Sequence, residues 1–177
     1  LIRDIRARQS TIRETLIEAD EEIKLRFIGK NKISDGVKPV VQTIRTTLNI
    51  DLDDFRDQPN HKEAFRYLRQ KIEGIGVFDD IAPFIVINDQ DSESAWSFTL
   101  IHEMAHLVLG KTGISGYYAE KRIEKFCNDV ASEFLLPQIE FEKFNPALSN
   151  FDNLKSEISQ YAFLKKLSST HLAYRLY

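Results

Sequence analysis

One uncharged stretch of the chain is interrupted by two histidines and a glutamate: Trp96-Ser-Phe-Thr-Leu-Ile-His102-Glu103-Met-Ala-His106-Leu-Val-Leu-Gly110. Apolar residues on all sides are typical of a helix that is buried all round. On such a helix, side chains four residues apart lie one above the other, so His102 and His106 can bind one metal ion. Glu103 points about 100° away, toward a water bound to that metal. The motif therefore predicts a zinc site with two histidine ligands and Glu103 as the catalytic base.

A third protein ligand is expected, because a catalytic zinc ion usually has three and one open position. The next predicted helix, at about 119–136, offers Glu120, Glu124 and Glu133. Glu124 shares a stripe with the apolar residues of this helix, whereas Glu133 lies on a more polar side and Glu120 at the frayed start. We therefore predict Glu124 as the third ligand, and Asn128 as an outer partner of a ligand histidine.

The composition indicates one well-packed domain with an appendage, because 42% of the 177 residues are hydrophobic and 29% are charged. A net charge of -3 argues against a nucleic-acid surface along the whole chain, and direct nucleic-acid binding is not expected. Cys127 is the one cysteine, which excludes an internal disulfide framework. The sequence contains no secretory segment and no long apolar span, so we expect a cytoplasmic protein with no membrane contact.

Helical periodicity predicts several further helices, and two short apolar runs predict strands. The expected helices cover 1–27, the region from Pro39 to Leu48, the region from Ala64 to Gly74, and a terminal pair at about 154–167 and 170–177. The expected strands are 75–78 and 83–87, and the acidic residues of 51–57 are expected to form a loop. The predicted fold class is thus α+β, a mainly helical zincin-like domain with a small β-sheet packed against the motif helix.

Three regions follow from this pattern. We expect an N-terminal helical region at 1–60, a zincin-like metallopeptidase core at 61–145 and a C-terminal helical hairpin at 146–177. Apolar residues recur in the N-terminal helix at steps of three and four, which predicts a homodimer seam. The same stripe would equally serve a helix that docks on its own domain.

Two segments of the chain resemble the ImmA/IrrE family of metallo-endopeptidases. They are Phe98-Thr-Leu-Ile-His-Glu-Met-Ala-His-Leu-Val-Leu-Gly110 and Glu124-Lys-Phe-Cys-Asn-Asp-Val-Ala-Ser-Glu-Phe-Leu-Leu-Pro137, and the run Pro83-Phe-Ile-Val-Ile-Asn88 is similar too. Members of that family are cytoplasmic zinc peptidases of bacteria and their mobile elements, which cleave helix-turn-helix repressors and so switch on genes. The resemblance implies a Zn²⁺-dependent endopeptidase with a repressor as its protein substrate.

One departure from the family supports a different hypothesis. Family members have a longer segment, with a further strand, where only residues 79–82 lie between Phe78 and Pro83 here. A shorter sheet edge and a long heptad helix would suit a regulatory or scaffold module with a zincin-like fold, which acts by binding a transcription regulator rather than by proteolysis. Hydrolysis of a non-peptide substrate is a third hypothesis.

A peptidase also needs a hydrogen-bond donor for the oxyanion, besides the metal. Tyr117, Tyr118, His171 and Arg175 are the candidates, and the sequence does not choose among them.

Overall fold

The computed structural model describes residues 27–74, 85, 87–88, 90–110, 117–146 and 151–177, together with 10, 11, 14, 15 and 18. In the helix that begins at Tyr117, side chains are described from residue 120 onward. The helical elements are η1 (Ile33–Asp35), α2 (Val37–Leu48), α3 (Leu52–Arg56), α4 (His61–Glu73), α5 (Glu93–Leu109), α6 (Tyr117–Leu135), α7 (Gln138–Phe141), α8 (Phe151–Leu164) and α9 (Ser169–Leu176).

The predicted β-sheet is wrong, because the described residues form helices and no strand. Most of the two predicted strands, 75–78 and 83–87, lies outside the described residues. Ile85 and Ile87 are described; they have no regular secondary structure and pack, partly buried, against the core. An extended segment can bury alternate side chains on a helical core without a partner strand. Apolar alternation alone therefore does not distinguish such a segment from a paired strand.

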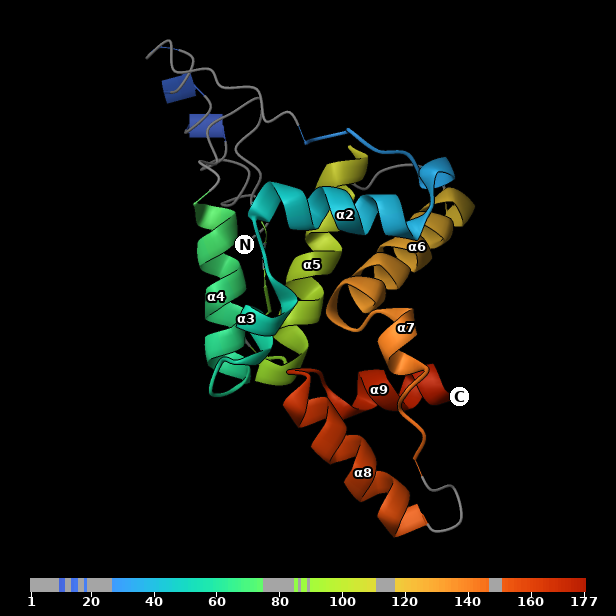
Figure 1. Ribbon diagram of the computed structural model, residues 1–177. Helices are drawn as coiled ribbons and strands as arrows, with labels where there is room; N and C mark the ends of the chain where they lie inside the picture. Colours follow the sequence, from blue (N-terminus) through green and yellow to red (C-terminus); the bar gives the residue numbers. More distant parts are fainter. Residues whose placement is uncertain are drawn as a thin grey trace.

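The helix that carries the motif lies at the centre of the fold, with α4 on one side, α6 on the other and α2 across one end (Figure 1). Fully buried side chains from these four helices make the core, which includes Ile44, Leu68, Ile101, Met104, Val108, Val130 and Phe134. The motif segment is a helix as predicted, but it is not buried all round: one face of α5 is buried, seven residues from Ser97 to Leu109, while Phe98 and Leu107 are partly exposed.

Gly110, at the C-terminal end of α5, packs closely against Gly29. Gly110 has φ 61°, the left-handed conformation that favours glycine, and a Cβ there would lie 2.9 Å from the Cα of Gly29. The N–H of Gly29 donates to Leu107 O at 3.0 Å, and the N–H of Asn31 donates to Val108 O at 3.1 Å. The loop around Gly29 therefore satisfies carbonyls that would otherwise lack partners.

Three arginines from three different elements bind carbonyl oxygens at the C-terminal end of α6. Arg45 of α2 donates to Phe134 O at 2.8 Å, and Arg56 of α3 donates to Leu135 O at 3.1 Å. Arg175 of α9 donates to Leu136 O and, at 3.4 Å, to Ser132 O. Positive charges at a helix C-terminus also interact favourably with the helix dipole. These contacts hold the C-terminal end of α6 against α2, α3 and α9.

The acidic segment after α2 is a helix rather than the predicted loop. In α3, the carboxylate of Asp51 accepts a hydrogen bond from the N–H of Asp53 at 2.7 Å and so caps the helix. Phe55 is fully buried on its inner face. Five residues are too few to show a helical period, which explains the error.

The C-terminal helical pair is confirmed and is held to the rest of the chain by charged contacts. Glu140 forms ion pairs with Arg56, at 2.6 Å, and with Lys165. Burial would raise the pKa of Glu140, but hydrogen bonds from these two cations outweigh it and lower that pKa. Ser168 caps α9 by accepting the N–H of His171 at 3.1 Å.

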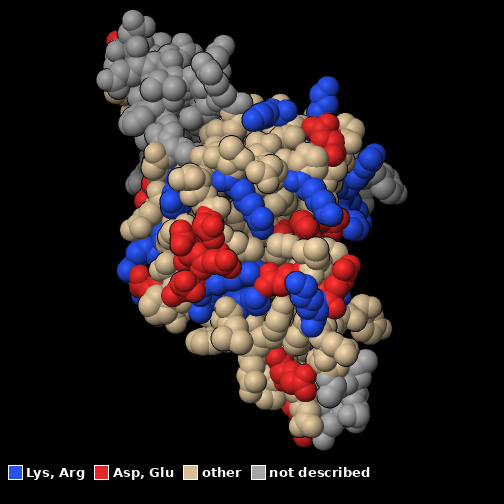
Figure 2. All heavy atoms as spheres, in the orientation of Figure 1, with Lys and Arg blue, Asp and Glu red and all other residues tan. Residues whose placement is uncertain are grey.

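The surface has charges of both signs. Figure 2 shows acidic and basic side chains interspersed over the face it presents. No helix of the described residues is long and apolar enough to cross a membrane. Five positions of the predicted N-terminal helix are helical and exposed, whereas its apolar stripe and the 79–82 departure lie outside the described residues.

Replacing Arg45 with Met should destabilise the fold by about 1–3 kcal/mol, because Phe134 O is left without its partner in a partly buried setting. Arg69→Met is the matched control: Arg69 pairs with Glu73 at 3.3 Å on the surface, and its loss should cost no more than about 0.5 kcal/mol. Urea unfolding of both variants measures the difference. Equal costs would contradict the role of Arg45 at the end of α6.

Candidate metal centre

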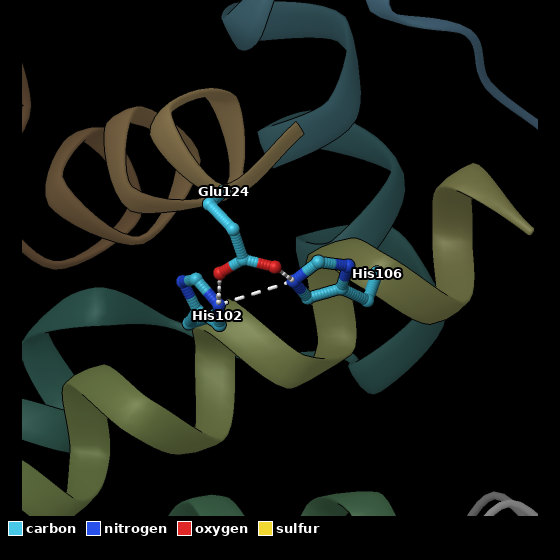
Figure 3. Close-up of side chains that lie close together, drawn as sticks. All are labelled: His102, His106 and Glu124. Carbon is cyan, nitrogen blue, oxygen red and sulfur yellow. Dashed lines mark hydrogen bonds and ion pairs between the residues drawn. The ribbon is translucent and has the colours of Figure 1, made fainter. Parts of the chain in front are cut away.

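The three predicted ligands converge between α5 and α6 (Figure 3). Nε2 of His102 lies 3.2 Å from Oε2 of Glu124, and Nε2 of His106 lies 3.2 Å from Oε1 of the same carboxylate. The two Nε2 atoms are 3.1 Å apart. The one-turn spacing of the histidines on α5 places both rings on the side that faces Glu124.

These distances fit the donor set of a tetrahedral metal ion. With metal–nitrogen bonds of about 2.0–2.1 Å, neighbouring ligands of tetrahedral zinc lie about 3.3 Å apart. Two imidazole nitrogens and one carboxylate oxygen are a common ligand set for catalytic zinc. Nδ1 of His102 is buried and has no hydrogen-bond partner among the described residues, and Nε2 of His102 faces the carboxylate of Glu124. His102, His106 and Glu124 thus have the donor atoms and the spacing to bind one divalent cation.

The centre opens toward Glu124. The side chains of His102 and His106 are each 13% exposed, whereas that of Glu124 is 48% exposed. Asn128 lies one turn further along α6, is exposed, and lines an open depression together with Glu124. No hydrogen bond joins it to the described side chains of either histidine, so its role as an outer partner stays a prediction.

Glu103 is half-buried on α5 and makes no hydrogen bond or ion pair with the described residues. Its charge nevertheless acts on Cys127, a residue of the helix that carries Glu124. Burial raises the pKa of the Cys127 thiol to about 12, with further contributions from the carboxylates of Glu124 and Glu103. Cys127 is therefore a protonated core residue, while Glu103 has a carboxylate that is not committed to structural contacts.

Two of the four candidate oxyanion donors have structural partners. The guanidinium of Arg175 binds carbonyls of α6 and the side-chain oxygen of Gln138, at 2.8 Å. Nε2 of His171 and Oγ of Ser132 form a hydrogen bond of 3.1 Å. The centre of the His171 ring lies 4.9 Å from that of the Phe98 ring. Burial, with the nearby charge of Arg175, lowers the pKa of His171 to about 4. The side chains of Tyr117 and Tyr118 lie outside the described residues.

Comparison with known families agrees with this geometry. A His-Glu-x-x-His helix that faces a glutamate from a second helix defines a candidate metal-dependent hydrolase. Residues 47–176, which are 130 of the 177 residues, match the model of the M78 peptidase family, described as the IrrE N-terminal-like domain. The chain belongs to this metallopeptidase family, as its resemblance to the ImmA/IrrE proteins predicted. Comparisons with curated proteins and with solved structures gave no significant match.

The depressed pKa of His171 should make stability fall as the pH falls from about 6.5 to about 4. In this interval the unfolded chain binds a proton at His171 and the folded protein does not, so acidification favours unfolding, by about 1–3 kcal/mol in total. His171→Gln should remove this part of the pH dependence. Urea unfolding at several pH values measures it, and an equal fall in both proteins would contradict the assignment.

Proposed function

We propose that this chain is a cytoplasmic zinc-dependent endopeptidase, in which His102, His106 and Glu124 hold the zinc ion. The observation that supports the proposal best is the convergence of two histidine nitrogens, 3.1 Å apart, on the two oxygens of one carboxylate, each 3.2 Å from its nitrogen, in a chain of a metallopeptidase family. Zinc in this position would polarise the scissile carbonyl and make a bound water more acidic.

The residues of the chain have separate roles in this proposal. Glu103 accepts the proton of the attacking water and passes it to the leaving amine, a role for which an uncommitted carboxylate beside the ligands is suited. The exposed side of Glu124 marks where the substrate reaches the centre. The two histidines, mostly buried, are held by the core and so keep the ligands in place.

The proposed substrate is a transcriptional repressor of the helix-turn-helix class, whose cleavage would derepress genes. The resemblance to the ImmA/IrrE proteins supports this choice of substrate. The candidate to test is a regulator encoded beside the gene for this chain. Mass spectrometry of that regulator after incubation would locate a defined cut.

Glu124→Gln should lower zinc affinity by at least about a hundredfold, more than an outer partner contributes, while the fold is kept. Glu133→Gln is the matched control, because Glu133 lies on the same helix and its carboxylate accepts the N–H of Gln138 at 2.9 Å. Zinc content after dialysis, with circular dichroism, measures both effects. Zinc lost from Glu133→Gln but kept in Glu124→Gln would move the ligand assignment to Glu133.

Glu103→Gln should keep zinc and lose about 10²–10⁴-fold in the rate of regulator cleavage, which is the usual contribution of a general base. Zinc content and the rate of appearance of the cut products are measured on the same preparation. Full zinc with an unchanged rate would remove Glu103 from the mechanism. Full zinc in the wild type with no cut in any regulator would instead favour the partner-binding module.

A further inference from the structure

Among the described residues, His102 has no partner for the hydrogen bond that usually orients a metal-binding histidine. Such a histidine binds the metal through one ring nitrogen and donates the N–H of the other to a carboxylate or a carbonyl, which fixes the ring. Nε2 of His102 lies 3.2 Å from Glu124, whereas Nδ1 is buried and makes no hydrogen bond to the described residues. Within this part of the chain, the orientation of the ring therefore depends on packing.

Two aromatic rings pack against His102 along α5. Phe98 lies one turn before it, with ring centres 6.5 Å apart and ring planes at 31°. His106 lies one turn after it, with ring centres 4.8 Å apart. Side chains four residues apart on a helix lie one above the other, and both separations are within the range in which aromatic rings attract. His102 is thus placed between a second ligand and a phenylalanine that is not a ligand.

The last helix holds Phe98 in turn. The centre of its ring lies 4.9 Å from that of the His171 ring on α9. Nε2 of His171 and Oγ of Ser132 form a hydrogen bond of 3.1 Å, which joins the His171 ring to α6. Because α6 also carries Glu124, the rings of His171, Phe98 and His102 connect the helix of the third ligand to the helix of the first two.

The exposure of Phe98 distinguishes it from the core residues of α5. The buried positions of this helix include Ile101, Met104 and Val108, which follow one another at steps of three and four on one side. Phe98 is partly exposed, as His102 is, and lies on the side of α5 that carries the ligands. A phenylalanine that served the core alone would lie with the buried residues.

We propose that Phe98 is a positioning residue of the metal centre, whose ring, held by His171, keeps the His102 ring in the orientation that presents Nε2 to the metal. This inference rests on the zinc site of the proposed function and adds to it a residue that acts through a ligand. A histidine side chain has several staggered rotamers. Since only molecules with the ring in the ligating orientation can bind, the apparent zinc affinity falls with the fraction of molecules in that orientation.

The test measures the zinc affinity of the full chain by competition with a chromophoric chelator. Phe98→Leu removes the ring and keeps an apolar side chain, so it should lower the affinity about three- to tenfold, the ratio that one aromatic pair supplies. Phe98→Tyr keeps the ring and should bind zinc like the wild type.

Phe65→Leu is the matched control. Phe65 is also a partly buried phenylalanine, and its ring centre lies 5.4 Å from that of Trp96 on α5. This variant should be less stable than the wild type in urea unfolding, because it loses a comparable aromatic contact, but its zinc affinity should be unchanged. The visible absorption of bound Co²⁺, which depends on ligand geometry, should change in Phe98→Leu and not in Phe65→Leu.

A double-variant comparison tests the part of His171. His171→Leu should lower zinc affinity less than Phe98→Leu does. In the Phe98→Leu background it should lower the affinity no further, because His171 acts through that ring. An additional loss in the double variant would overturn the link from His171 through Phe98.

Wild-type zinc affinity in Phe98→Leu, or an equal loss in Phe65→Leu, would overturn the positioning role and leave the zinc site in place. If Phe98→Leu does not fold, His171→Leu decides instead: a lowered affinity supports the role and an unchanged one overturns it. Failure of the wild type to bind zinc would overturn the proposed function, and the positioning role with it.

Discussion

The position of α6 depends on the carbonyl groups at its C-terminal end, which are bound by arginines from α2, α3 and α9. The last carbonyls of a helix have no partners within the helix, so these contacts satisfy groups that would be costly to bury alone. A shift of α6 by one residue, about 1.5 Å, would disrupt all three contacts together. Glu124 is ten residues before Phe134 on the same rigid helix, so the arginines also set where its carboxylate meets α5.

The metal centre is built from groups that would be unfavourable without a cation. Two imidazole nitrogens 3.1 Å apart repel each other when both present a lone pair or both present an N–H, so a hydrogen bond between them requires different tautomers of the two rings. The carboxylate of Glu124 offsets part of this cost, and a divalent ion would offset the rest. Because α5 is buried and α6 is held at its end, the ligands are positioned before any metal binds. We infer that metal affinity depends on contacts far from the centre.

Short-range pattern predicted the motif helix and the glutamate that faces it, because both depend on which residues share one face of a helix. The α3 helix was missed because it is too short to show a period, and the sheet was wrong because Ile85 and Ile87 pack on the core without strand pairing. The arginine contacts at the end of α6 join residues 89, 79 and 39 positions apart in sequence. The local sequence around an arginine does not show whether its side chain is exposed to solvent or binds a distant carbonyl. Only the structure distinguishes the two.

The last helix of the chain is part of the candidate site rather than an appendage to it. Within α9, His171 binds the side chain of Ser132 and Arg175 binds its carbonyl, so two contacts hold α9 to one residue of α6. The ring of His171 also lies against Phe98, one turn before His102 on α5, so α9 contacts both helices that carry ligands. The family match extends to residue 176 and includes this helix. Because these contacts reach both helices that carry ligands, α9 helps to hold α5 and α6 together around the metal centre.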